Sequence, residues 1–204
     1  MDLRDVLRLP FVYIAFQGAV GGLRVRKTCL DILDVKAGER VLDIGCGPAY
    51  YLQRLPEIEY FGFDTDRRYI KHAKSRYGHK ASFFCEEFDS GHALSLGPFD
   101  CVILMGLLHH LDDQSCDATL GLVASSLTAS GRVLALDVAV HDEQSYFERK
   151  FAQSDRGKFV RSPTEFESLA ARHFTQVDGR LISEWWFPSI YWAMTLKTPL
   201  GKKR

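Results

Sequence analysis

The stretch Val41-Leu42-Asp43-Ile44-Gly45-Cys46-Gly47-Pro48 (residues 41–48) begins as a short apolar run and ends in a glycine-rich turn. An apolar run with such an exit is typical of a buried parallel strand. Glycine at positions 45 and 47 lets the backbone turn tightly and approach a ligand without a side-chain clash. Pro48 suits the first turn of a helix, so a helix is predicted over residues 48–55.

Strand and helix patterns alternate around this stretch. Short apolar runs occur at residues 41–44, 60–63, 81–85, 99–105 and 131–138, and helical patterns occupy residues 66–77 and about 112–127. The alternation predicts βαβ units and a mostly parallel sheet. Ligands of such sheets bind beyond the carboxyl ends of the strands, so the strand exits are where functional residues are expected.

The pattern changes after the fifth strand. Residues 139–161 are polar and charged, without a clean strand pattern. Ser162-Pro163-Thr164-Glu165 then has the composition of a capping box, and it predicts a helix with its body at residues 166–173. Two strand-like runs follow, at about residues 175–182 and 188–196.

Two acids mark the ends of the first two predicted strands. Asp43 lies two residues before Gly45, and Asp64 follows 21 residues after Asp43. An acid at the end of the second strand is the expected ligand of ribose hydroxyls. Tyr50 occupies the position of the third glycine of a dinucleotide fingerprint, which argues against a bound pyrophosphate. A buried Asp43 would also repel a pyrophosphate and attract a cationic amino-acid group.

Five stretches together resemble the motifs of class I S-adenosylmethionine-dependent methyltransferases. VLDIGCGPAYYL (residues 41–52) is similar to the glycine-rich motif of that family, and YFGFDTD (60–66) to its ribose-binding motif. ASFFCEEF (81–88), FDCVILMGLLHHLDD (99–113) and LTASGRVLALDV (127–138) resemble the third, fourth and fifth strands with their exits. The resemblance runs in order from about Val41 to Asp137.

The resemblance implies the fold class and the domain organisation. The fold would be α/β, a three-layer αβα Rossmann-like arrangement with a seven-stranded, mostly parallel sheet and an antiparallel C-terminal strand. Residues 1–204 would form a single methyltransferase domain. Within it, residues 1–35 would be an N-terminal helical cap, and residues 139–161 would be a substrate-covering insertion.

The resemblance also implies how S-adenosylmethionine, and its product S-adenosylhomocysteine, would be held. The methionine part would lie against the backbone of the glycine-rich turn, with an acid beneath it: Gly45, Cys46, Gly47 and Asp43. Ribose and adenine would contact residues after the second and third strands: Asp64, Thr65, Glu87 and Phe88, with Glu86 as a rival to Glu87. The sulfonium would lie near Met105 and Gly106.

The acceptor side is less defined. A histidine can exchange protons near neutral pH, so His110 is the candidate general base, although a histidine here can equally order the loop. Tyr13, His109 and His141 are the candidate substrate contacts, and His141 also fits a solvated loop. Methyl transfer from an activated sulfonium depends mainly on alignment, so an obvious catalytic residue is not required.

The composition limits the kinds of partner and location that are expected. Lys plus Arg and Asp plus Glu each number 26, and this neutral balance argues against a long nucleic-acid footprint. Five cysteines lack any CxxC spacing, which indicates no metal site and a reducing, cytoplasmic location. The apolar run at residues 9–20 is too short to cross a bilayer, so no transmembrane segment is expected.

The favoured function is therefore methyl transfer to the oxygen or nitrogen of a small molecule. One alternative is a degenerate domain that binds the cofactor or a partner protein without turnover. Another is an NAD(P)-dependent oxidoreductase, against which the missing third glycine argues. The aromatic stretch at residues 185–187 fits either core packing or a homodimer surface.

Overall fold

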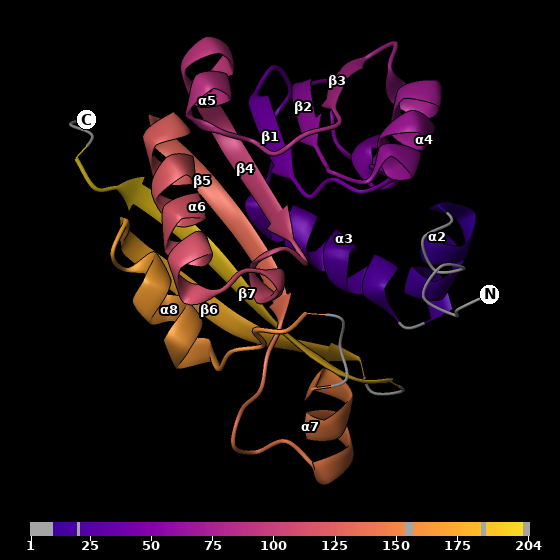
Figure 1. Cartoon of the computed structure of the whole chain (residues 1–204), viewed down its shortest axis with the longest axis vertical. Helices are drawn as coiled ribbons and strands as arrows, with labels where there is room; N and C mark the ends of the chain where they lie inside the picture. The colour runs from indigo at the N-terminus through magenta and orange to yellow at the C-terminus, as the bar shows by residue number, and fades with distance from the viewer. Residues whose placement is uncertain (1–9, 20, 154–156, 185–186, 202–204) are drawn as a thin grey trace.

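The structure is a computed structural model of the chain, and it describes residues 10–19, 21–153, 157–184 and 187–201. Seven strands form one sheet: β1 (Arg40–Ile44), β2 (Glu59–Phe63), β3 (Ala81–Phe84), β4 (Phe99–Met105), β5 (Leu127–Val138), β6 (Phe174–Glu184) and β7 (Phe187–Pro199). Their order across the sheet is β3-β2-β1-β4-β5-β7-β6 (Figure 1). Strands β1 to β5 are parallel, and β7 runs antiparallel to both β5 and β6. The predicted fold class is confirmed.

Helices cover both faces of the sheet. They are α2 (Pro10–Ala19), α3 (Gly22–Leu33), α4 (Arg67–Tyr77), α5 (Ser90–Leu96), α6 (Asp113–Ser126), α7 (Tyr146–Gln153) and α8 (Pro163–Ala170), with 3-10 turns η1 (Leu52–Arg54) and η2 (Leu108–His110). Capping side chains start several of them. Asp112 accepts a hydrogen bond from the Ser115 amide at the start of α6, and Ser162 and Glu165 form the predicted capping box of α8.

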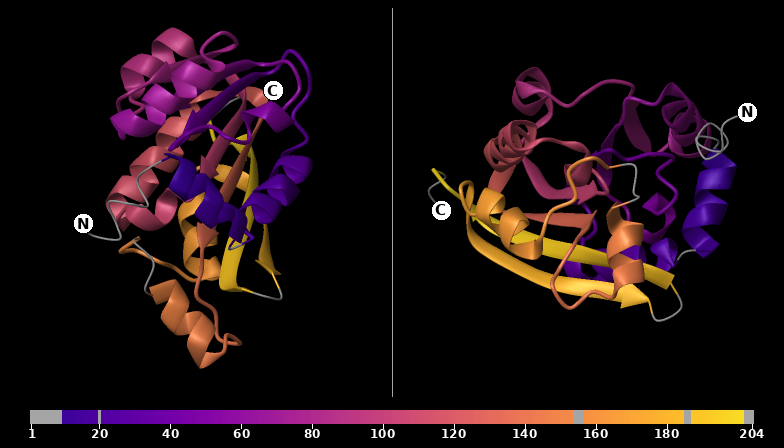
Figure 2. Two further views of the ribbon diagram at one scale, coloured as in Figure 1. Left: turned by 90° about the vertical axis from the view of Figure 1, so that its right-hand side faces the viewer. Right: turned by 60° about the horizontal axis from the view of Figure 1, so that its bottom comes forward.

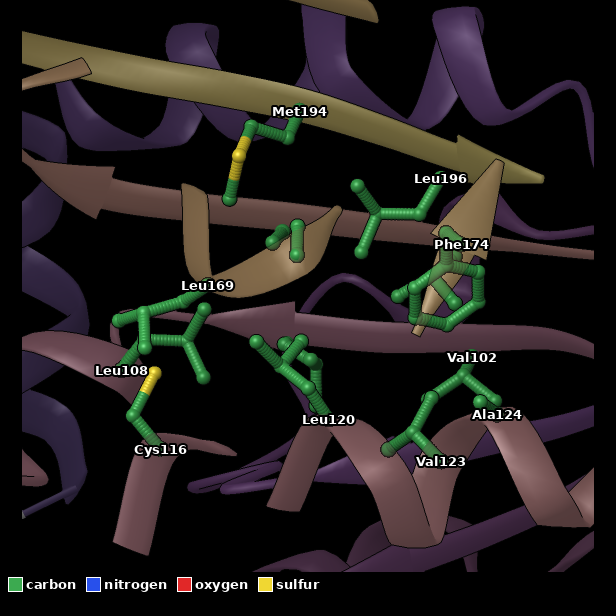
Figure 3. Packing of buried hydrophobic residues seen from close by; sticks show 14 of the residues in the cluster. Val102, Leu108, Cys116, Leu120, Val123, Ala124, Leu169, Phe174, Met194 and Leu196 are labelled. Carbon is green, nitrogen blue, oxygen red and sulfur yellow. The ribbon is translucent and has the colours of Figure 1, made fainter. Parts of the chain in front are cut away.

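Alternate residues of each buried strand feed two separate cores. On β4, Val102 and Leu104 pack under α6 and α8, whereas Cys101 and Ile103 pack under α3 and α4. Figure 3 shows the first core, with α6 side chains pointing at the strands. Because both faces of β4 are covered, its sequence reads as a continuous apolar run. Burying one large aliphatic side chain contributes roughly 1.5–3 kcal/mol, so the two cores hold the layers together.

The C-terminal end of α3 attaches to the sheet through Arg132 of β5. Its Nε donates to the Leu33 carbonyl at 2.7 Å, and its Nη2 donates to the Asp34 carbonyl at 2.7 Å. The same guanidinium forms a two-pronged pair with the Glu39 carboxylate, both contacts being 2.9 Å. Paired contacts of this kind fix geometry as well as energy. The end of α3 is therefore held in a defined position beside the sheet.

Three segments differ from the prediction. The helix predicted at residues 48–55 is wrong, since only the short turn η1 forms there. Helix α5 was not predicted, and a capping box between Asp89 and His92 starts it. Residues 139–161 contain α7, which lies against β7 beyond the end of the sheet (Figure 2) and exposes Tyr146 and Phe147.

Among the residues that the structure describes, no helix is both long enough and apolar enough to span a membrane. The longest described helix, α6, has 14 residues, and about 20 apolar residues are needed to cross a bilayer.

Gly179 on β6 tests the packing of the sheet edge. A Cβ atom there would lie 1.9 Å from Cζ2 of Trp192, which is buried on β7. Because the indole ring is rigid, we expect Gly179→Ala to lower the free energy of unfolding by about 2 kcal/mol. Guanidinium unfolding measures this. Gly18→Ala is the matched control, because its Cβ would meet only the flexible end of Leu23 at 3.3 Å; an equal loss in both variants would contradict the packing argument.

Candidate active site

Four strand exits meet at the carboxyl edge of the sheet. Gly45 follows β1, Asp64 follows β2, Gly106 follows β4, and Asp137 lies near the end of β5. Strand β1 pairs with β2 on one side and β4 on the other, so the strand order reverses at this point. A ligand crevice is expected where connections leave such a sheet in opposite directions.

The turn after β1 is left-handed at three positions. The φ angles are 76° at Gly45, 55° at Gly47 and 51° at Ala49, which an α-helix cannot accommodate. The amides of Gly45 and Cys46 both donate to the Phe63 carbonyl, at 2.8 and 3.0 Å. Because the helix predicted from residue 48 is absent, no helix N-terminus offers free amides here. The chain reaches β2 through η1 alone, and the amides of Gly45 and Cys46 are already bonded to β2.

Cys46 contributes its backbone to the turn. Its side chain is buried, and a Cβ atom at Gly62 would lie 3.0 Å from its sulfur. Burial, and then the charges of Asp43 and Asp64, raise the pKa of the Cys46 thiol well above its usual range. The thiol therefore stays protonated, and it is not activated as a nucleophile.

Asp43 is completely buried beneath this turn. Its Oδ2 accepts hydrogen bonds from the Tyr60 hydroxyl and, at 2.6 Å, from the Tyr51 hydroxyl. Its Oδ1 is buried with no hydrogen-bond partner among the described residues. Burial raises the pKa of Asp43 to about 7, against the opposing effect of the two hydroxyls. An orphaned carboxylate oxygen in this position fits a ligand that brings its own donor.

Asp64 connects the ends of β1 and β2. Its Oδ2 accepts from the Gly47 amide at 2.8 Å, and its Oδ1 accepts from the Asp66 amide at 2.7 Å. Burial raises the pKa of Asp64, while these amides lower it. A carboxylate can accept about four hydrogen bonds, so both oxygens keep capacity for hydroxyl donors. Thr65 follows in an exposed bend.

The two candidate glutamates after β3, Glu86 and Glu87, have different surroundings. Glu86 lies 3.5 Å from Nε2 of His92, and Glu87 is exposed beside it. Phe88 is buried in the core, with its ring 5.2 Å from that of Phe63. The structure therefore places Phe88 under the sheet exit among other aromatic residues.

Sequence reasoning missed Arg26. This residue is buried on α3, its Nη2 would lie 3.8 Å from a Cβ atom at Gly106, and its charge lowers the pKa of Asp43. An arginine among the apolar positions of an amphipathic helix was the signal that could have found it. Arg26 brings a positive group to an edge where acids predominate.

At the end of β4, the side chain of Met105 is buried, whereas Gly106 has space beside its backbone. Gly106 has a φ of 74°, and its amide donates to the Leu136 carbonyl at 2.7 Å. Met105 is buried under α3 and α4. Gly106 therefore presents bare backbone between Arg26 and His109, each of which would lie 3.8 Å from a Cβ atom at this position.

His109 and Asp137 form a buried pair between β4 and β5. His109 Nδ1 lies 2.6 Å from Asp137 Oδ1, which also accepts from the His109 amide at 3.1 Å. The two contacts fix the ring orientation. His110, the predicted general base, is exposed, and its ring lies 4.2 Å from that of His109.

The segment 157–161 closes over this pair. A Cβ atom at Gly157 would lie 1.9 Å from Cδ2 of His109, and the Phe159 amide donates to the His109 carbonyl at 3.0 Å. Arg161 is buried and donates to the carbonyls of Leu108 at 3.0 Å and Leu111 at 2.7 Å. The segment after α7 is thereby fastened to the loop after β4.

The remaining candidates lie apart. His141 is half-buried, and its amide donates to the side chain of Gln144. Tyr13 lies on α2, and its side chain falls outside the described part of the structure. Trp185 and Trp186, from the predicted dimer surface, also lie outside the described residues. Within the described residues, no three His, Cys, Asp or Glu side chains are placed to hold a metal ion.

Comparison with known proteins agrees with this arrangement. The profile of a family described as a methyltransferase domain matches residues 41–131. The matched residues include the turn after β1, Asp64 and Gly106, and they support the resemblance of the chain to the class I S-adenosylmethionine-dependent methyltransferases. Methyltransferase GfsG of Streptomyces halstedii is 29% identical over 129 residues, covering 60% of this chain and 46% of GfsG. The chain spans less than two thirds of the length of the curated relatives that it matches.

Two solved structures share the fold over nearly the whole chain. A chain of the complex between the Haloferax volcanii Trm112 methyltransferase activator and the putative methyltransferase aligns with a TM-score of 0.73 at 16% identity, covering 98% of this chain and 99% of that one. Haemonchus contortus phosphoethanolamine N-methyltransferase 2, in complex with phosphomonomethylethanolamine and S-adenosylhomocysteine, aligns with a TM-score of 0.70 at 16% identity, covering 98% and 60%. Such low identities establish the fold alone.

Arg161 tests how firmly the segment 157–161 is fastened. Its Asp113 partner has an 83% exposed side chain, so the ion pair itself contributes little. Losing the bonds to the carbonyls of Leu108, Phe159 and Leu111 is more costly, and we expect Arg161→Met to lower the free energy of unfolding by about 2 kcal/mol. Urea unfolding measures the change. The control, Arg172→Met, removes an exposed pair with Asp117 and should cost less than about 0.5 kcal/mol; equal effects would contradict this interpretation.

Proposed function

We propose that this methyltransferase transfers a methyl group from S-adenosylmethionine to an oxygen or nitrogen of a small molecule. One observation carries the proposal: a fully buried Asp43 with an orphaned oxygen lies beside two left-handed glycines and Asp64, at the carboxyl edge of the sheet. This set offers an acid for an ammonium group, bare backbone for a thioether chain, and a second acid for ribose. These residues fit S-adenosylmethionine.

The nucleoside would be held by the exits of β2 and β3. Asp64 keeps acceptor capacity beyond its two amide donors, which suits the ribose hydroxyls. Glu86 has His92 as a neighbour, so Glu87 is the better candidate for the adenine amino group. Thr65 borders the same region. Phe88 would support the adenine region through Phe63, because it is buried beneath that side chain.

The amino-acid part would lie between Asp43 and Arg26. No helix N-terminus is available for its carboxylate, since η1 replaces the expected helix and the first amides of the turn are already bonded. Arg26, buried near Gly106, supplies a positive charge on the same side as Asp43. An arginine binds carboxylates with paired donors, so Arg26 is the candidate partner of the carboxylate.

When bound, the cofactor supplies an already activated sulfonium methyl group. The chain then has to align the acceptor and exclude water, and both tasks depend on geometry. Gly106 leaves room at the exit of β4, where the reacting groups would meet. The buried His109–Asp137 pair, covered by Gly157, would form the floor of the acceptor side. Asp137 would orient His109, which we place ahead of His110 as an acceptor contact.

Several features favour a small acceptor. The chain has no net charge at neutral pH, so it lacks the basic excess that nucleic-acid binding requires. The segment 157–161 closes over the acceptor side, which suits a ligand that can be enclosed. One structural neighbour is named for methylation of phosphoethanolamine, a small amine. A homodimer and a cytoplasmic location stay predictions.

The cofactor proposal is tested by calorimetric titration with S-adenosylmethionine, S-adenosylhomocysteine and NAD. We expect both sulfur nucleosides to bind, NAD not to bind, and Asp64→Asn to weaken binding at least tenfold because ribose loses a charged acceptor. Arg26→Met should weaken S-adenosylhomocysteine but not methylthioadenosine, which lacks the amino-acid group. Asp31→Asn, at an exposed site on α3, is the control. Binding of NAD in place of the sulfur nucleosides would overturn the proposal.

The acceptor class is tested with S-adenosylmethionine labelled in its methyl group. Pools of small amines, phenols and carboxylic acids, total RNA and a protein extract are each incubated with the enzyme, and label is followed into each fraction. We expect transfer into a small-molecule pool, with loss of transfer in His109→Ala because the acceptor side loses its buried ring. Label in RNA or protein alone would contradict the small-molecule assignment, and binding without any transfer would favour a degenerate domain.

A further inference from the structure

The two oxygens of the Asp43 carboxyl group have different surroundings. Oδ2 accepts both tyrosine hydroxyls, from Tyr51 in the turn before η1 and from Tyr60 on β2. Oδ1 has no partner among the described residues and is shielded from solvent. A buried polar atom without a partner is rare and calls for a specific explanation. The asymmetry means that one oxygen is held by the protein and the other is left for something else.

The two tyrosines can act only as donors to Asp43. Burial, together with the neighbouring Asp43, raises the pKa of both phenols well above their usual value. Each phenol therefore keeps its single proton at neutral pH. Both tyrosines are buried, with Tyr51 4% and Tyr60 1% exposed, and both hydroxyls face Oδ2 of Asp43. Each hydroxyl therefore donates its proton to that oxygen.

Several neighbouring groups act in opposite directions on the pKa of Asp43. The ionisable groups that face it come from the turn after β1, from β2 and its exit, and from α3: Cys46, Tyr51, Tyr60, Asp64 and Arg26. Burial, with a smaller contribution from Asp64, raises the pKa of Asp43 to about 7, while the two hydroxyls and Arg26 oppose the rise. Without the hydroxyls the carboxyl group would be protonated at neutral pH, and Oδ1 could not attract a cation.

We propose that Tyr51 and Tyr60 are positioning residues that hold Asp43 by one oxygen, so that the ammonium group of the bound cofactor and a proton compete for the other. This inference rests on the proposed function and adds to it. It assigns a role to two hydroxyls, that of Tyr51 in the glycine-rich stretch and that of Tyr60 on β2, beyond the proposed cofactor contacts. It also makes recognition of the amino-acid part of the cofactor dependent on pH, whereas the nucleoside part makes no direct contact with Asp43.

The sign of the pH dependence follows from the charges. The ammonium group binds the ionised carboxylate, so affinity is highest above the pKa of Asp43 and falls as the pH drops through it. Below about pH 7 the dissociation constant should rise by up to tenfold per pH unit. Removing one hydroxyl raises the pKa of Asp43 and shifts this fall to higher pH.

Paired titrations isolate Asp43 from its neighbour Asp64. S-adenosylhomocysteine carries the amino-acid group and methylthioadenosine does not, so the ratio of their dissociation constants cancels any contribution from Asp64. In the wild-type protein, we expect the dissociation constant of S-adenosylhomocysteine, divided by that of methylthioadenosine, to increase severalfold as the pH falls from about 8.5 to about 5.5. In Tyr60→Phe and Tyr51→Phe the increase should begin at higher pH, with near wild-type ratios at the alkaline end. Tyr77→Phe, a buried tyrosine whose hydroxyl contacts Arg76, should keep the wild-type profile.

A second readout needs no ligand. Carbon-13 NMR of labelled aspartate carboxyl groups, with Asp43 assigned through Asp43→Asn, should show one group titrating near pH 7 that moves to higher pH in Tyr60→Phe. If one tyrosine variant fails to fold, the wild-type titration still tests the pKa of Asp43, and the other tyrosine variant tests the positioning role. A carboxyl group that titrates in the usual acidic range would overturn the proposal.

The outcomes separate this inference from the proposed function. If neither nucleoside binds at any pH, the proposed function fails. If both bind with the same pH profile, or if the tyrosine variants weaken S-adenosylhomocysteine equally at every pH, the function stands and the positioning role is overturned. A shifted profile in Tyr60→Phe, with an unshifted one in Tyr77→Phe, supports the role.

Discussion

The parallel pairing of β1 with a strand on each side is the constraint on which the site depends. Val41 pairs with Tyr60 of β2 and with Cys101 of β4, so the carboxyl ends of three strands lie at one edge. The chain leaves β1 toward β2 and leaves β4 toward β5, which separates the connections and opens the crevice between them. Acids that are far apart in sequence are brought together because strand direction, and not chain proximity, decides where their side chains lie.

Placing several acids at one buried edge has an electrostatic cost. Hydrogen bonds from the protein reduce this cost more for some carboxylate oxygens than for others. Asp64 accepts hydrogen bonds from two amides, one at each oxygen, and Oδ1 of Asp137 contacts both the amide and the ring Nδ1 of His109. Yet Oδ1 of Asp43 and Oδ2 of Asp137 are buried with no partner among the described residues. An unpaired buried acceptor costs about 1–3 kcal/mol, so these two oxygens mark where stability has been given up. Both lie at the edge where a ligand would enter, which is where such a cost is compensated by binding.

Local sequence determines the strands, the glycine turn and Asp64, because each depends on a short pattern of burial or on backbone freedom. It does not determine Arg26, Asp137 or Arg161, whose partners lie on other elements. The helix predicted at residues 48–55 fails for a related reason. Pro48 favours the start of a helix locally, but the left-handed residues at 45, 47 and 49, with the short connection to β2, leave room only for η1. The conformation of this turn is therefore determined by its attachment to the sheet and not by local helix propensity.

The two sides of the crevice come from different parts of the chain. The family profile ends at residue 131, and it includes the turn after β1, Asp64 and Gly106. Asp137, which orients His109, and the segment that covers it, from Gly157 to Arg161, lie beyond that boundary. On the proposed function, the shared part holds the cofactor and the remainder shapes the acceptor side. Since His109 lies inside the profile but is positioned from outside it, changes after residue 131 can alter acceptor choice while cofactor binding is kept. This division explains how a resemblance that identifies the cofactor so clearly carries little information about the acceptor.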